Sequence, residues 1–397
     1  MDDTARRGRV GEVFLAFLIL GLTSFGGPVA HLGYFRDAFV TRRKWLTDEA
    51  YADIVALCQF LPGPASSQVG IAIGKLRAGY PGAVAAFVAF TAPSVMLLLA
   101  FAWGLTALDL VAIDGALHGL KIAALAVVAQ AVWAMAKSLT PDRPRQLVAL
   151  AAAIVVLAVP VPLMQIGVLA VAGVGGALLP AARSPGVPLS ARSPGVTLSA
   201  RSLPWLVAFF VLLTGLPLLA VTGDATLVLV EKFYRTGSLV FGGGHVVLPL
   251  LETELVRPGL IDRDIFLAGY GAAQAVPGPL FSFAAYAGAM LNVPPNGLWG
   301  GMLALIAIYV PSFLLVFGAL PLWQQLRGIA RLRRALDMAN AAVVGLLLAA
   351  VYNPVFTSAV ATPLDFALAL AAFALLAIVK LPPWLVVLVS AAVGLLL

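Results

Sequence analysis

Apolar runs of helix length, separated by short polar or charged segments, fill most of the 397-residue chain. Candidate membrane crossings lie at 81–106, 115–137, 146–159, 163–179, 204–221, 298–320, 335–352, 364–379 and 384–397. These runs lack the alternation of apolar and polar positions over roughly ten residues that marks an outer-membrane β-strand. The pattern therefore predicts an all-α polytopic membrane protein.

Two further pairs of helical segments are interrupted by a Pro-Gly-Pro sequence. In the first pair, residues 47–60 and 64–75 flank the break. At 1.5 Å per residue, each piece reaches only about 20 Å, whereas the hydrocarbon core of a bilayer is about 30 Å thick. We therefore expect discontinuous or re-entrant helices here rather than two crossings.

Three short motifs occur twice in the same order, at offsets of 216, 215 and 218 positions. They are Phe-Gly-Gly at 25–27 and 241–243, Gln-x-x-Pro-Gly-Pro at 59–64 and 274–279, and Pro-Ser at 93–94 and 311–312. Three matches at nearly one offset indicate the duplication of a whole unit. The predicted organisation is a first repeat at 1–180, a disordered linker rich in Pro, Ser and Gly at 181–203, an extra apolar segment at 204–222 and a second repeat at 223–397.

Composition excludes a water-soluble protein and a nucleic-acid partner. With 61% hydrophobic residues, 11% charged residues and a mean hydropathy of +1.01, the chain has too little polar surface to cover a soluble body of this length. The net charge of +7 does not form a stripe on one face, because the Lys and Arg residues lie between the apolar runs. Their placement reports membrane topology instead.

The loop charges indicate that the two repeats have opposite orientations. The loop after the first Phe-Gly-Gly is basic, with Arg42, Arg43 and Lys44, whereas the matching loop of the second repeat is acidic on balance. Positive loops face the cytoplasm, so equivalent loops lie on opposite sides of the membrane. The sequence therefore predicts inverted-topology repeats, with the 204–222 segment supplying the extra crossing that inverts the second repeat.

Inverted repeats with discontinuous helices are typical of secondary transporters, in which the substrate site lies where the breaks meet. A helix that starts at Pro64 or Pro279 directs free backbone N–H groups toward the break, and this favours an anion. The alternative is that Gly and Pro only kink tightly packed helices. The expected substrate-binding residues are Gly26, Gly27, Gln59, Pro62, Gly63, Pro64, Ser66 and Ser67 in the first repeat, and Gly242, Gly243, Gln274, Pro277, Gly278, Pro279 and Ser282 in the second.

Titratable residues near these motifs are candidates for proton coupling or for balancing the charge of an anion. They are His31, Glu49, His118, Lys121, His245 and Asp264. A histidine beside an anion site could couple protons to transport. Structural alternatives stay open for all six: a histidine that only hydrogen-bonds, a lysine that extends to the membrane surface, or an acid that caps a helix. No cofactor or metal site is expected, since the lone Cys58 leaves no cysteine cluster.

The order of Phe-Gly-Gly and Pro-Gly-Pro in two halves resembles the long-chain, two-repeat form of the chromate ion transporter family. The resemblance covers both halves and excludes the linker. It implies a multi-pass carrier of the prokaryotic inner membrane that exports chromate, with sulfate as the structural analogue, a proton gradient as the driving force and chromate resistance as the result. Pro28 follows the first Phe-Gly-Gly, whereas Gly244 follows the second, so the copies differ there.

Two other functions stay open from the sequence. One is a carrier or channel for sulfate or another small anion. The other is a membrane enzyme acting on a lipid-linked substrate, which would need a cluster of acids and histidines that the sequence does not suggest. A phosphate-binding Gly-Lys-Ser/Thr loop is missing as well, which disfavours an ATP-driven pump. We therefore predict a transporter and not an enzyme, embedded in the lipid bilayer, and the sequence leaves open whether it forms a homodimer.

Overall fold

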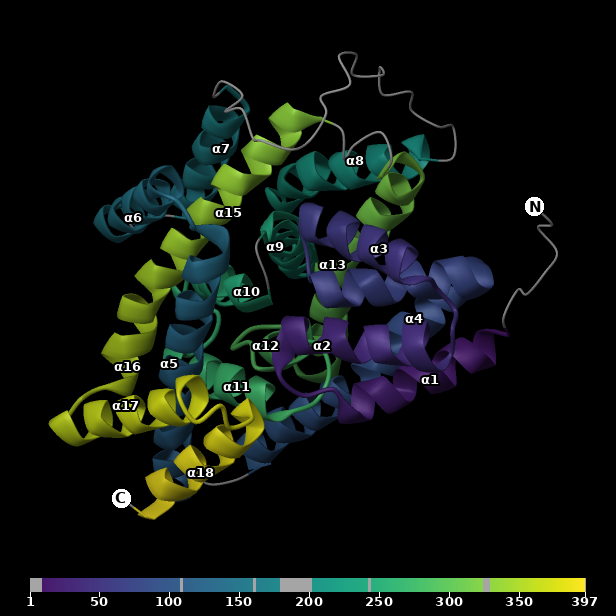
Figure 1. The fold of residues 1–397 in the computed structure, drawn as a ribbon. Helices are drawn as coiled ribbons and strands as arrows, with labels where there is room; N and C mark the ends of the chain where they lie inside the picture. The colour runs from purple at the N-terminus through teal and green to yellow at the C-terminus, as the bar shows by residue number, and fades with distance from the viewer. Residues whose placement is uncertain are drawn as a thin grey trace.

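The computed structural model describes residues 9–107, 110–159, 162–178, 202–241, 244–323 and 329–396 (Figure 1). Within these ranges every regular element is a helix, as the apolar runs predict. The first repeat contains α1 (Val10–Thr23), α2 (Gly27–Arg36) with the π-helical turn η1 (Asp37–Arg42), α3 (Asp48–Phe60), α4 (Ala65–Ala107), α5 (Leu110–Leu139), α6 (Arg143–Ala158) and α7 (Pro162–Leu178).

After α8 (Leu203–Ala220), the second repeat follows the same order in shorter pieces. It contains α9 (Ala225–Leu239), η2 (Gly244–Val246), α10 (Val247–Leu251), η3 (Glu252–Val256), α11 (Arg263–Ala275), η4 (Leu280–Ser282), α12 (Phe283–Ala289), α13 (Gly297–Ala319) with η5 (Leu320–Leu322), α15 (Ala330–Ala350), η6 (Val351–Phe356), α16 (Thr357–Ala359), α17 (Pro363–Ala377) and α18 (Pro383–Leu396). The extra helix α8 packs against α9 and α13.

Side-chain caps define the starts of the two helices that precede the breaks. The hydroxyl of Thr47 accepts the N–H of Ala50 at the start of α3, and the carboxylate of Asp262 accepts two N–H groups at the start of α11. Inside α4, Ala78 and Gly79 leave the helical conformation, and Gly79 has a φ of +70°. The helix is thus a short segment followed by a long membrane helix, which matches the two runs expected at 64–75 and 81–106.

Among the described residues, five helical stretches are long and apolar enough to cross a membrane: Ala65–Ala107, Asp114–Leu139, Leu203–Ala220, Gly297–Leu322 and Ala330–Ala359. The helices α6, α7, α17 and α18 have 16, 17, 15 and 14 residues. At 1.5 Å per residue they reach only about 21 to 26 Å, less than a bilayer core of about 30 Å. The apolar pattern predicts that each of these four runs crosses the membrane. Their helices are instead short and form two hairpins, α6 with α7 and α17 with α18.

The repeats exchange these hairpins. Helices α6 and α7 of the first repeat pack on α15 of the second, whereas α17 and α18 of the second repeat pack on α5 of the first. In Figure 1 the two hairpins lie at opposite ends of the α5 and α15 pair. Glycines allow the close approach, because Gly119 lies against the backbone of Ser390 and Gly345 against that of Ala149. Neither repeat is therefore complete without the other.

Other pairs of helices follow the same symmetry. Helix α1 packs along α4, and its counterpart α9 packs along α13. Gly21 faces the backbone of Phe90 in the first pair, and Gly237 faces the backbone of Ile308 in the second. Together with the reversed loop charges, these matched contacts correspond to a two-fold relation whose axis lies in the membrane plane. The fold is the predicted polytopic membrane protein with two inverted repeats and discontinuous helices.

Candidate functional site

Both Pro-Gly-Pro sequences are breaks between helices. Helix α3 ends at Phe60 and α4 begins at Ala65, whereas α11 ends at Ala275 and η4 begins at Leu280. At the centres of the breaks, Gly63 has a φ of +121° and Gly278 a φ of +99°. Glycine adopts such backbone angles without the steric cost that a Cβ imposes. The turns at these two positions therefore favour glycine.

Each break is hydrogen-bonded to the Phe-Gly-Gly entrance of the opposite repeat. The N–H of Gly63 donates to the carbonyl of Val240 (2.7 Å), directly before the second Phe-Gly-Gly. The N–H of Gly278 donates to the carbonyl of Ser24 (2.9 Å), directly before the first. The two bonds are equivalent under the repeat symmetry. They bring four segments together that are far apart in the sequence.

The third repeated motif also meets the break of the opposite repeat. A Cβ on Gly63 would lie 2.8 Å from the hydroxyl oxygen of Ser312, and a Cβ on Gly278 would lie 3.1 Å from that of Ser94. Ser312 and Ser94 are both fully buried. The hydroxyl of Ser94 donates to the carbonyl of Thr91 (2.9 Å), whereas that of Ser312 has no hydrogen-bond partner within the described ranges. All three motifs therefore converge on one region, which we call the break centre.

The amino terminus of α4 supplies the break centre with hydrogen-bond donors. The first bond of this helix runs from the N–H of Gln68 to the carbonyl of Pro64 (2.9 Å). The N–H groups of the three preceding residues belong to the first turn and have no acceptor within the helix. Ser66 and Ser67 in that turn are buried, with 2% and 3% of their surface exposed. This turn is a donor-rich helix start of the kind that binds anions.

The second break is less open to a ligand. The N–H of Ser282 donates to the carbonyl of Pro279 (3.1 Å), and the hydroxyl of Ser282 donates to the same oxygen. The first turn of η4 therefore offers fewer donors than that of α4. Gln274 is partly buried, and its amide nitrogen has no hydrogen-bond partner in the part of the chain that the structure describes. Its counterpart Gln59 is exposed on α3, so equivalent positions in the two repeats have different surroundings.

His31 is fully buried and joins the two breaks. Its Nε2 lies 3.2 Å from the carbonyl oxygen of Ser24, the same oxygen that accepts from Gly278. Because a carbonyl only accepts hydrogen bonds, we assign the proton to Nε2. Its Nδ1 then accepts from the hydroxyl of Ser66, 3.4 Å away. His31 is therefore in direct contact with the amino-terminal turn of α4.

His245 occupies a different environment from that of His31. Its Nδ1 lies 2.9 Å from the hydroxyl oxygen of Tyr270.

The glycines of the first Phe-Gly-Gly motif lead into α2. Gly26 has a φ of +97°, and Gly27 begins α2 with Pro28 in its first turn. A Cβ on Gly244 would lie 3.2 Å from Pro28, so the two residues that follow the Phe-Gly-Gly motifs face each other. Gly242 and Gly243 lie outside the described residues.

Several buried polar residues of the break centre are missing from the sequence-based set. Gln68 donates from its side chain to the carbonyl of Pro62 (2.6 Å), and its Oε1 has no hydrogen-bond donor among the residues described. Tyr309 places its hydroxyl 3.5 Å from that of Ser67. Ser24 is buried with an unpartnered hydroxyl. Gln68 lies one helical turn after Pro64, a spacing that could have identified it, whereas only the fold brings in Tyr309 from α13.

Three of the remaining titratable candidates, His118, Lys121 and Asp264, form ion pairs between helices. Lys121 of α5 is buried and lies 3.0 Å from the carboxylate of Asp264 at the start of α11. Its neighbour on α5, His118, lies 2.8 Å from Asp365 at the start of α17. Glu49 is exposed near the start of α3, which Thr47 caps.

The acidic loop of the second repeat is also ion-paired. Glu254 lies 3.1 Å from Lys232 and 2.8 Å from Arg235, and Glu252 lies 3.5 Å from Arg257. Burial raises the pKa of the Glu252 carboxyl, and the neighbouring Arg257 opposes this shift. These acids have cationic partners close by.

The break centre is therefore built mainly from neutral donors: backbone N–H groups, serine and tyrosine hydroxyls, a glutamine and a histidine. Among the described residues, no group of three or more His, Cys, Asp or Glu side chains could hold a metal ion. Neutral donors around a helix amino terminus suit a small oxyanion, because each oxygen of the anion can accept several hydrogen bonds.

Comparison with known proteins identifies the family. The model of a family described as chromate transporter matches residues 11–177 and 227–395. The chain belongs to the chromate transporter family. The two matched ranges leave out the linker and α8. Members of this family are transporters and not enzymes, which confirms the prediction for this chain.

Curated relatives align over most of the chain. A chromate transport protein of Pseudomonas aeruginosa is 26% identical over 348 residues, which is 85% of this chain and 79% of the relative. A chromate transport protein of Cupriavidus metallidurans is 26% identical and covers 88% of this chain and 83% of its own length. An uncharacterized transporter of Methanocaldococcus jannaschii is 26% identical, with coverages of 85% and 82%. No solved structure matches the chain.

Valine at either central glycine should abolish transport. At Gly63 the new Cβ would lie 2.5 Å from the amide nitrogen of Gln68, and both glycines have a left-handed backbone. We expect Gly63→Val and Gly278→Val each to lower transport by at least about tenfold, since a left-handed conformation alone costs an L-residue roughly 1–2 kcal/mol. Transport into vesicles, normalised to the amount of inserted protein, measures the effect.

Gly104→Val is the matched control, because an added Cβ meets no atom within 4 Å there. Normal chromate binding and transport by both break variants would show that the breaks are only packing kinks. Ser66→Ala, which removes one hydrogen-bond donor, should lower the affinity by about tenfold or less.

Proposed function

We propose that this protein is a secondary transporter of the inner membrane that exports chromate and so confers chromate resistance, with sulfate as a competing analogue. One observation carries the proposal: the helix breaks of two inverted repeats meet, each hydrogen-bonded to the other repeat, around buried neutral donors. Irregular backbone at membrane depth is tolerated when it is buried in protein or lines a pathway. Family membership supports chromate as the substrate.

The anion would bind at the amino-terminal turn of α4. The three N–H groups of the first turn and the hydroxyls of Ser66 and Ser67 provide donors on one side, and Tyr309 and Gln68 complete the surroundings. A tetrahedral dianion accepts hydrogen bonds on all four oxygens, so a ring of donors fits both chromate and sulfate. Charge balance would then require a proton, because the hydrogen bonds and close contacts between described residues of this centre involve no lysine or arginine side chain.

His31 would link proton uptake to anion binding. In the neutral ring, Nδ1 accepts from the Ser66 hydroxyl and thereby occupies its proton. A second proton on Nδ1 converts this nitrogen into a donor, so the Ser66 hydroxyl becomes free to donate to the anion. The cationic ring also offsets part of the charge of the dianion. Binding of a proton and binding of the anion would therefore favour each other.

The two repeats differ in a way that supports alternating access. On α11, Gly271 packs against the backbone of Leu120 in α5, and the Lys121–Asp264 pair joins the same helices. On α3, the matching face is uncovered, because Glu49, Ala56 and Gln59 are exposed. In inverted repeats, exchange of these two arrangements opens the pathway to the opposite side. In the proposed cycle, α5 leaves α11 as α15 approaches α3.

Chromate flux in everted vesicles tests the function. Labelled chromate should accumulate when the vesicle interior is alkaline, because a proton and an anion that bind together also move together toward the side with fewer protons, and excess sulfate should slow the uptake. In His31→Gln, which cannot titrate, we expect the stimulation by the pH gradient to disappear. Uptake of sulfate or chloride without chromate uptake would instead support the alternative of a carrier or channel for another anion.

The Lys121–Asp264 pair should control the closed arrangement of α5 on α11. Lys121→Met and Asp264→Asn should each increase the labelling rate of Gln274→Cys in a Cys58→Ala background by about two- to fivefold, as expected for an ion pair worth up to about 1 kcal/mol. Asp264→Asn should have the larger effect, because it leaves a buried ammonium group unpaired. The exchanged pair, Lys121→Asp with Asp264→Lys, should restore the slow rate.

Arg36→Gln serves as the control for this experiment, since Arg36 and Asp48 form an exposed pair on the first repeat. Equal labelling rates in all these variants would contradict a role of the pair in closing α11.

A further inference from the structure

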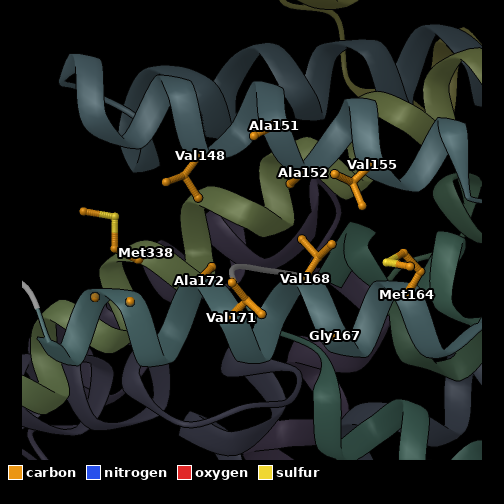
Figure 2. A pocket seen from close by; sticks show the side chains of 12 residues that line it. Val148, Ala151, Ala152, Val155, Met164, Gly167, Val168, Val171, Ala172 and Met338 are labelled. Carbon is orange, nitrogen blue, oxygen red and sulfur yellow. The ribbon is translucent and has the colours of Figure 1, made fainter.

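A large apolar groove lies between α6 and α7, away from the break centre. Figure 2 shows side chains of both helices pointing toward each other across it, among them Val148 and Val155 of α6 and Val168 and Val171 of α7. Met338 of α15 closes one end. The groove has a volume of about 560 Å³, and its lining is almost entirely apolar. It is large enough for part of a lipid-sized ligand.

The groove is open toward the outside of the protein. Val171 has 74% of its surface exposed, and Gly175 is exposed beside it. The glycines of α7 keep the groove wide, because an added Cβ at Gly167 or Gly175 would meet no atom within 4 Å. Because α6 and α7 pack on a membrane-spanning helix, this opening faces the bilayer. An acyl chain is the apolar ligand available there.

The end of the groove at Met338 is basic. Arg334 lies one helical turn before Met338, and its carbonyl approaches Gly176 of the groove wall. Arg331 lies one turn earlier, and Arg143 begins α6 five residues before Val148. Among the described residues, these three arginines form no ion pair, whereas Arg145 is paired with Asp142 at 3.0 Å. Unpaired positive charge thus gathers at one end of an apolar channel.

The surroundings of Arg334 differ from those of an exposed arginine that contributes only to membrane topology. Its Nε is sealed from solvent and has no hydrogen-bond acceptor among the described residues. A buried donor without a partner costs free energy, so an anion bound at this end of the groove would stabilise Arg334 by supplying an acceptor. A phosphate group provides such an acceptor together with the opposite charge.

We propose that the groove binds one acyl chain of an anionic phospholipid, with the phosphate held by Arg331, Arg334 and Arg143. Positive loops place this end at the cytoplasmic leaflet, where anionic lipids meet basic pockets between helices. A helix from a second copy of the chain could cover Val171, but it would leave the buried donor of Arg334 without an acceptor. A free phosphate ion would satisfy the arginines and leave the groove empty.

Native mass spectrometry of the purified full-length protein tests the proposal, with dioleoyl phosphatidylglycerol and dioleoyl phosphatidylcholine as probes. The wild-type protein should retain phosphatidylglycerol more tightly than phosphatidylcholine. The double variant Arg331→Gln, Arg334→Gln should bind phosphatidylglycerol about tenfold more weakly with little change for phosphatidylcholine. Gly167→Leu should weaken the binding of both lipids, because its side chain fills the groove.

The double variant Arg42→Gln, Arg43→Gln is the matched control, because it removes two arginines elsewhere in the chain. Its lipid binding should equal that of the wild type. The proposal is overturned if the groove and arginine variants bind phosphatidylglycerol like the wild type, or if inorganic phosphate displaces the lipid completely. It is also overturned if the protein is a dimer that carries no lipid and becomes monomeric in Gly167→Leu.

Discussion

Two backbone hydrogen bonds, from Gly63 to Val240 and from Gly278 to Ser24, hold the breaks of the two repeats together. Inside a bilayer, an N–H group that leaves a helix must find another partner, because no water is available to replace it. Each break here finds that partner in the opposite repeat. The hairpins also pack on the opposite repeat: α6 and α7 lie against α15, and α17 and α18 lie against α5. The two halves therefore depend on each other both for satisfied backbone groups and for packing.

This arrangement also explains why the centre is polar without being strongly charged. Helix starts and hydroxyl groups provide donors that stay in place whether or not an anion is bound, so they need no counter-charge when the site is empty. Buried Lys121 is instead paired with Asp264 at the interface of α5 and α11. A neutral centre and paired charges outside it suit a protein that must release its anion as well as bind it.

Much of the fold could be predicted from residue types and their spacing along the chain. The breaks, their left-handed glycines and the duplication follow from Pro, Gly and motif spacing, because these residues restrict the backbone wherever they stand. The inverted orientation follows from loop charges. The partners of each break could not be predicted in this way, since Val240 and Ser24 carry no side-chain signal for a backbone acceptor.

The candidate site was predictable only in part, for related reasons. The turn at Ser66 and Ser67 follows from the position of Pro64, but Tyr309 reaches it through tertiary packing of α13. The sequence also suggests equal roles for Ser66 and Ser282, whereas the hydroxyl of Ser282 donates to its own helix start. Repeat symmetry in sequence therefore overstates the symmetry of the site, because equivalent helices are packed differently.

A cryo-electron-microscopy map of the protein purified in the presence of chromate tests the central claim most directly. We predict density for the anion between the Pro64 and Pro279 turns, within hydrogen-bond distance of the α4 amino terminus and the hydroxyls of Ser66 and Ser67. Density for the anion only at the basic loops, with an empty break centre, would contradict the account.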